Sequence, residues 1–147
     1  MNLEAQKDEP TGYHILNRAV FYVSRLVSSQ KERDFVKTNY NDIRRVFSIW
    51  VCMGKDENSM AYVHLVEDDL LSSYSWKGGL DLLNIVLIGI SNELPEHDEK
   101  YELHRLLSAL LSAELTVDEK LGMIKTEYSI PVDDKLRKDM NAMCNLS

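Results

Sequence analysis

The residues best suited to chemistry stand at the start of the chain, in the stretch MNLEAQKD. Glu4 and Gln6 are two positions apart, so on a β-strand their side chains point to the same face. A carboxylate is a preferred ligand of hard cations such as magnesium, and the carbonyl oxygen of Ala5 can add a second oxygen. Gln6 can position a water or a phosphate oxygen but cannot act as a base. The stretch predicts part of a magnesium site, with a solvent-facing pair on an edge strand as the alternative.

The elements that position these residues are a short strand and a long helix. Residues 2–7 alternate weakly, as a strand does, and residues 8–12 are rich in turn-forming types. Thr11 is suited to cap a helix over residues 12–30. Spacings of three and four residues predict that the buried face of this helix consists of Tyr13, Leu16, Val20, Val23 and Val27. A second face carries Arg18, Tyr22 and Arg25.

Three further strands are predicted in the middle of the chain. Residues 46–53 are almost all apolar, β-branched or aromatic, which is typical of a central strand. Residues 60–66 and 82–90 give the other two. Between the strands, residues 31–45 form a loop or a short helix, and residues 67–79 remain unassigned. Trp50 and Trp76 are expected in the core or at its rim.

The C-terminal part of the chain has the apolar spacing of helices. Leucines between positions 103 and 115 mark one broad apolar face. Thr116 and Glu119 form a capping-box pattern that opens a second helix, and Asp133 can cap a third. The order of elements predicts an α/β fold with a sheet core in residues 1–92 and a helical region in residues 93–147.

Composition and charge limit the classes of protein. With 44% hydrophobic and 28% charged residues, the 147-residue chain is too apolar to be disordered and has room for one core. No apolar run reaches the ~18 residues of a membrane span. Cys52 and Cys144 are far apart, which favours reduced thiols and a cytoplasmic protein.

The charge is unevenly distributed. Nine Lys/Arg against six Asp/Glu give residues 1–55 a charge of +3, and eight against eighteen give residues 56–147 a charge of −10. A nucleic-acid site needs local positive charge at the phosphates, so only the first third of the chain can supply one.

Three stretches, in order, resemble the PD-(D/E)XK nuclease superfamily: NLEAQKD, YHILNRAVFYVSRLVSSQ and NYNDIRRVFSIWVCM. They are most similar to its transposase-like, recombination-promoting branch. In that branch Gln replaces the usual catalytic Lys, which gives a Glu-x-Gln strand. The following helix carries an Arg and then a Tyr four residues on, here Arg18 and Tyr22. A Tyr precedes the next apolar strand, here Tyr40, and the helical tail from Leu115 also resembles these proteins.

The resemblance implies a partial restriction-endonuclease-like core and metal-dependent cleavage of DNA. It assigns Glu4 and the carbonyl of Ala5 as Mg²⁺ ligands, with Glu4 and Gln6 as catalytic residues. It assigns Arg18 and Tyr22 to DNA binding, although Arg18 could instead be a solvated arginine or one stacked on Tyr22. The family pattern also has an Asp on a preceding strand, which Met1–Leu3 do not provide. We therefore expect a nuclease fragment, truncated at its N-terminus and at its C-terminus, that is inactive alone.

Two other functions remain open. The chain could be an interaction module that pairs with itself or with a full-length nuclease, through strand edges and the leucine-rich helices. It could also be a degenerate remnant without activity.

Overall fold

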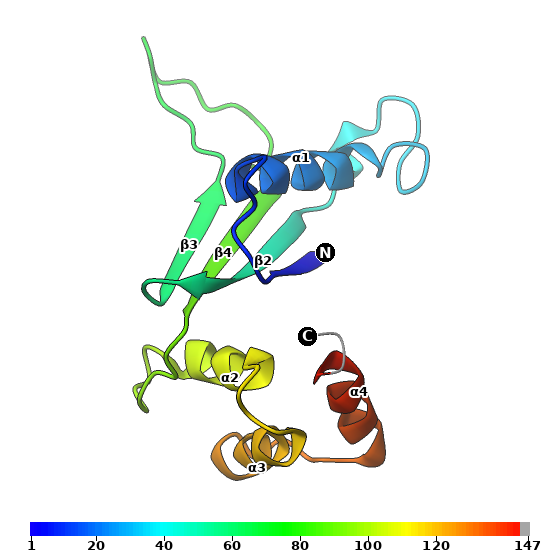
Figure 1. Ribbon diagram of the computed structural model, residues 1–147. Helices are drawn as coiled ribbons and strands as arrows, with labels where there is room; N and C mark the ends of the chain where they lie inside the picture. The colour runs from blue at the N-terminus through cyan, green and yellow to red at the C-terminus, as the bar shows by residue number, and fades with distance from the viewer. Residues whose placement is uncertain (145–147) are drawn as a thin grey trace. The chain divides into compact units, whose positions relative to one another are not determined.

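Four strands form one mixed sheet in the computed structural model, which describes residues 1–144. The strands are β1 (Asn2–Gln6), β2 (Val46–Lys55), β3 (Ser59–His64) and β4 (Leu83–Ser91), in the order β1-β2-β4-β3. β1 runs parallel to β2, and β3 runs antiparallel to β4 (Figure 1). The sheet and the helices that follow it confirm the α/β class. The chain divides into two compact units, Met1–Ile90 and Ser91–Ser147.

Helix α1 (Ile15–Ser28) lies against one face of the sheet (Figure 1). The core between them contains Ala19 and Val23 from the helix and Trp50 and Ile85 from the sheet, all fully buried. Residue 19 is an alanine, and a small side chain at the contact lets a helix approach a sheet closely. The unit Met1–Ile90 therefore has its core on the α1 face of the sheet.

Two predictions about this helix were wrong. The predicted face is buried only in part: Val23 is in the core and Val27 packs against it, whereas Tyr13, Leu16 and Val20 are 43%, 42% and 43% exposed. The face that packs on the sheet contains Ile15 and the small Ala19, and Val23 is the residue that it shares with the predicted face. Thr11 does not cap the helix, because the turn continues to His14, which is the N-cap and makes no side-chain capping hydrogen bond.

The predicted strands 46–53, 60–66 and 82–90 are confirmed as β2, β3 and β4. Residues 31–45 form a loop that contains the 3₁₀ helix η1 (Tyr40–Asp42). Residues 65–82 form a long loop without helix or strand. Trp76 lies in that loop and is 74% exposed, so its placement in the core or at the rim was wrong.

The unit Ser91–Ser147 contains the helices α2 (Glu102–Leu111), α3 (Val117–Glu127) and α4 (Asp134–Cys144). The predicted capping box of α3 is present: the Thr116 hydroxyl accepts from the Glu119 N–H at 3.3 Å, and the Glu119 carboxylate accepts from the Thr116 N–H at 2.8 Å. Asp133 accepts from the Leu136 N–H at 2.7 Å, as expected of a cap. The core of this unit is centred on Leu121, Ile124 and Met140. Of the predicted leucine face, Leu103 is exposed.

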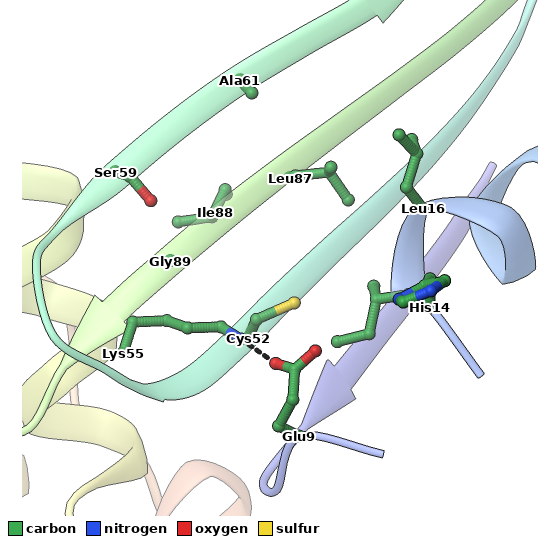
Figure 2. A pocket seen from close by; sticks show the side chains of 11 residues that line it. Glu9, His14, Leu16, Cys52, Lys55, Ser59, Ala61, Leu87, Ile88 and Gly89 are labelled. Atoms are coloured by element: carbon green, nitrogen blue, oxygen red, sulfur yellow. Dashed lines mark hydrogen bonds and ion pairs between the residues drawn. The ribbon is translucent and has the colours of Figure 1, made fainter. Parts of the chain in front are cut away.

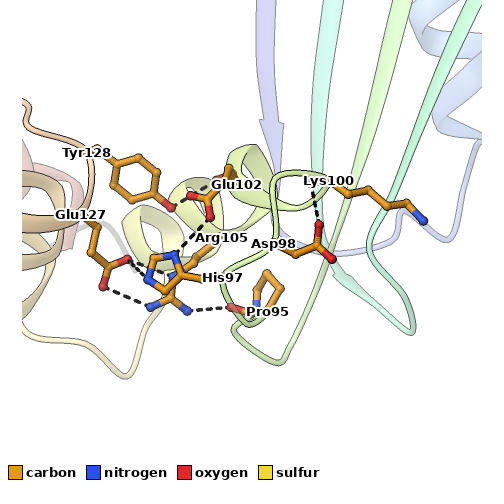
Figure 3. A network of polar contacts seen from close by, with 8 residues as sticks. All are labelled: Pro95, His97, Asp98, Lys100, Glu102, Arg105, Glu127 and Tyr128. Carbon is orange, nitrogen blue, oxygen red and sulfur yellow. Dashed lines mark hydrogen bonds and ion pairs between the residues drawn. The ribbon is translucent and has the colours of Figure 1, made fainter.

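An ion-pair network joins α2 to the end of α3 (Figure 3). Arg105 donates two hydrogen bonds to the Glu127 carboxylate, at 2.9 and 3.1 Å, and a third to the Pro95 carbonyl at 2.7 Å. The His97 ring lies between Glu127, at 3.3 Å, and Glu102, at 3.1 Å. The Arg105 and Glu127 side chains are only 14% and 21% exposed, so this pair is more protected from solvent than an ordinary surface pair.

We expect Glu127→Gln to lower the stability of the helical unit by about 1 kcal/mol at neutral pH. The substitution removes the charge of the carboxylate that accepts two hydrogen bonds from Arg105. Hydrogen bonds from Arg105 hold the pKa of the Glu127 carboxyl below its ordinary value. The stabilisation is therefore present above that ordinary value and lost as the pH falls through the lowered one. Thermal unfolding at neutral pH and at successively lower pH checks this, since the difference between wild type and variant should shrink as the pH falls below the ordinary pKa of a glutamate. A difference that stays the same in acid would contradict the assignment.

Candidate functional site

The side chains of Glu4 and Gln6 lie on the face of the sheet that α1 covers. In the parallel register Asn2 pairs with Ser48, Glu4 with Trp50, and Gln6 with Cys52. Register partners on neighbouring strands point to the same face, and the Asn2 amide donates to the Ser48 hydroxyl at 3.4 Å. Asn2, Glu4 and Gln6 are partly buried, whereas Leu3 and Ala5 on the opposite face are exposed.

Arg18 lies among three aromatic rings. Its guanidinium carbon is 5.4 Å from the ring centre of Tyr13, 5.3 Å from that of Tyr22 and 5.3 Å from that of Trp50. These distances are within the range of cation–π attraction. One guanidinium nitrogen also donates to the Tyr13 hydroxyl at 2.6 Å. Hydrogen bonds raise the pKa of Arg18 above its ordinary value, and the contribution of Tyr22 is larger than that of Tyr13. Arg18 is therefore a permanent positive charge.

Trp50 connects the two predicted groups of residues. It is the register partner of Glu4, it lies under the guanidinium of Arg18, and its ring meets Tyr22 edge-on at 5.9 Å. The Gln6 amide nitrogen donates to the Asp8 carbonyl at 2.9 Å, which orients the amide. The fold thus brings a carboxylate, an amide and a guanidinium to one face of the sheet, near the edge that β1 forms.

The donors on β1 do not complete a magnesium site. Glu4 supplies one carboxylate and Ala5 one carbonyl, whereas Mg²⁺ takes near-octahedral oxygen ligands. Glu9, the next acidic residue after Asp8, is ion-paired with Lys55. Within residues 1–144, no group of three or more His, Cys, Asp or Glu side chains is placed to hold a metal ion. A metal at Glu4 would need further ligands from elsewhere.

A second group of polar residues was missed by the sequence analysis. Glu9, His14, Cys52 and Lys55 line a pocket beside the first turn of α1. Their positions belong to separate segments, and Glu9 and Lys55 are 46 residues apart in sequence. No spacing rule groups such residues. The Cys52 thiol is free and buried.

Comparisons with known proteins identify no relative. No family model, no curated protein and no solved structure matches the chain. Of the helices that the structure describes, none is long and apolar enough to cross a membrane.

Proposed function

We propose that this chain carries part of the active site of a metal-dependent DNA endonuclease of the transposase-like PD-(D/E)XK branch. The observation that supports the proposal is the placement of Glu4, Gln6 and Arg18 on one face, around Trp50. In this role Glu4 and the Ala5 carbonyl contribute magnesium ligands, Gln6 orients a water or a phosphate oxygen, and Arg18 with Tyr22 contacts the DNA backbone. The setting is the bacterial cytoplasm, where DNA and magnesium are available.

Under this proposal the chain does not cleave DNA by itself. One carboxylate and one carbonyl are too few protein ligands to hold magnesium against water. β1 is an edge strand of the sheet, so its outer side is available for a further strand that carries an additional carboxylate. A full-length nuclease is a partner that could supply such a strand.

Arg18 is the residue whose loss should weaken DNA binding most. We expect Arg18→Ala to weaken the retardation of a short duplex at low salt by about three- to tenfold and to reduce the salt slope by about one. Arg25→Ala is the matched control, because Arg25 lies on the same helix but over the Phe21 ring, away from Trp50. Electrophoretic mobility shifts over a salt series make the measurement. Equal losses in the two variants would argue against a specific role for Arg18.

Incubation of the same preparation with plasmid DNA and magnesium separates binding from cleavage. We expect no cleavage above background. Robust cleavage that disappears in Glu4→Ala would overturn the claim of inactivity. If neither DNA binding nor magnesium binding by calorimetry is found, the chain is better described as a remnant.

A second candidate function is self-association through exposed apolar surface. The loop 65–82 presents Leu70 and Leu71 at 95% and 97% exposure, and Trp76 at 74%. The edge strand β3 also exposes Met60 and Tyr62. Contiguous apolar surface and free strand edges are features of interaction sites.

This candidate predicts a molecular mass above the 17.0 kDa of the single chain at high protein concentration. Replacement of Leu70 and Leu71 together by serine should return the protein to the monomer, since it removes apolar area without touching a core. Size-exclusion chromatography with light scattering measures the mass. A clean monomer at high concentration in the wild type would rule out self-association through this loop.

A further inference from the structure

A pocket of about 360 Å³ opens beside the first turn of α1, and none of the residues assigned to the nuclease site lines it (Figure 2). Ile15 and Leu16 from the helix and Leu87 from β4 give it apolar walls. The volume is within the range of small-molecule sites, which are mainly apolar with a few polar groups. The pocket is also at the carboxyl ends of β2 and β4, where ligands bind in open α/β sheets.

The polar groups of this pocket favour an anion. The Lys55 ammonium lines it from the end of β2. The first turn of α1 faces it as well. The His14 side chain makes no capping hydrogen bond to this turn, and the turn contains no acidic residue. The first N–H groups of a helix carry partial positive charge and attract a carboxylate. Lys55 and the helix terminus therefore act in the same direction.

The protein's own Glu9 marks where such an anion binds. Its carboxylate is ion-paired with Lys55 in the pocket, as the dashed line in Figure 2 shows. Glu9 belongs to the turn between β1 and α1, and its side chain is 60% exposed, whereas that of Lys55 is 33% exposed. A residue on an exposed turn can move aside at small cost, so a ligand carboxylate can replace it.

We propose that this pocket binds a medium-chain monocarboxylate, with its carboxylate beside Lys55 and the first turn of α1 in place of Glu9. The aliphatic chain lies against Ile15, Leu16 and Leu87. The Sγ atom of Cys52 points toward the middle of the pocket (Figure 2). The aliphatic chain of the bound ligand therefore covers it. The assignment is independent of the proposed nuclease function, because the two sites share no residue.

Protection of the Cys52 thiol provides the test, with octanoate as the probe. In a Cys144→Ser background Cys52 is the single cysteine. It is 5% exposed, and burial raises the pKa of its thiol, so modification by the small uncharged reagent methyl methanethiosulfonate starts from a slow rate. We expect saturating octanoate to slow that modification at least about fivefold. Nonspecific denaturation by the fatty acid would instead accelerate it.

Three variants decide which groups hold the carboxylate. Lys55→Met should raise the half-protecting concentration of octanoate by about three- to tenfold, and Glu9→Gln should lower it by about threefold, because the competing carboxylate is gone. Lys7→Met, in the exposed stretch after β1, is the control and should change nothing. If Lys55→Met does not fold, as checked by circular dichroism, Glu9→Gln still decides the matter by its opposite direction.

Three results would overturn the proposal. The first is an absence of protection by octanoate. The second is equal protection by octanol, and the third is unchanged protection in both pocket variants. Either of the last two would show that the pocket binds any apolar chain and does not recognise the carboxylate.

Discussion

Trp50→Ala is expected to lower the free energy of unfolding of the unit Met1–Ile90 by about 3–5 kcal/mol, the usual range for loss of a fully buried aromatic side chain. Trp50 has no exposed surface and belongs to the core that α1 closes. Its indole N–H donates to the buried Ser48 hydroxyl at 2.8 Å, so truncation also removes a hydrogen bond. Tyr22 and Arg18 each lose one aromatic contact as well. Urea unfolding followed by circular dichroism gives the measurement.

The chain contains its own control for this experiment. Trp76 is 74% exposed on the loop 65–82, so Trp76→Ala should change stability by less than about 0.5 kcal/mol. Trp50→Phe should fall between the two, at about 1–2 kcal/mol, because it keeps a ring under Arg18 and loses the indole N–H. Similar losses for Trp50→Ala and Trp76→Ala would contradict the placement of Trp50 in the core.

The strands and the caps of α3 and α4 could be predicted because their signals are local. The apolar run at residues 46–53 can be buried as a central strand, and it forms β2. The capping box of α3 needs only Thr116 and Glu119, three residues apart, and both hydrogen bonds are present. Neither signal depends on the rest of the chain.

The buried face of α1 could not be predicted in the same way. Its sequence has an apolar stripe through Leu16 and Val20 and another through Ile15 and Ala19, and Val23 belongs to both. Periodicity finds both and favours the one with larger side chains. The choice is made by the close approach to the sheet, which Ala19 permits, and that is a property of the packed structure.

The candidate site could be predicted only in part, because the sequence shows local spacing but not which strands and helices pack together. The two-residue spacing of Glu4 and Gln6 correctly places both on one face of β1. Which face that is depends on the register of β1 against β2, and the pairing of Glu4 with Trp50 spans a long stretch of chain. The contact of Arg18 with Trp50 and the ion pair of Glu9 with Lys55 also join residues that are far apart in the sequence. Local spacing contains no information about these contacts.

Asn84→Ala is expected to destabilise the unit Met1–Ile90 by about 2–4 kcal/mol, because it removes one buried and two partly buried hydrogen bonds. Asn84 is 1% exposed at the start of β4. Its amide nitrogen donates to the carbonyls of Val46, at 3.1 Å, and Asp81, at 2.8 Å, and its amide oxygen accepts from the Tyr62 hydroxyl. It therefore ties β2, β3 and the end of the loop 65–82 together. Asn2→Ala is the matched control: Asn2 makes one long hydrogen bond of 3.4 Å, so its loss should cost less than about 1 kcal/mol.

A double-mutant cycle shows whether these bonds act as one unit. Tyr62→Phe alone removes only the hydroxyl and should cost about 1 kcal/mol, since the exposed ring of Tyr62 remains on β3. In the Asn84→Ala background the hydroxyl has already lost its acceptor, so the same change should cost close to nothing. Chemical unfolding of the four proteins gives the coupling energy. If the stability losses of the two single variants add, the Tyr62 hydroxyl is hydrogen-bonded to water rather than to Asn84. Asn84 then anchors the loop only through the carbonyls of Val46 and Asp81.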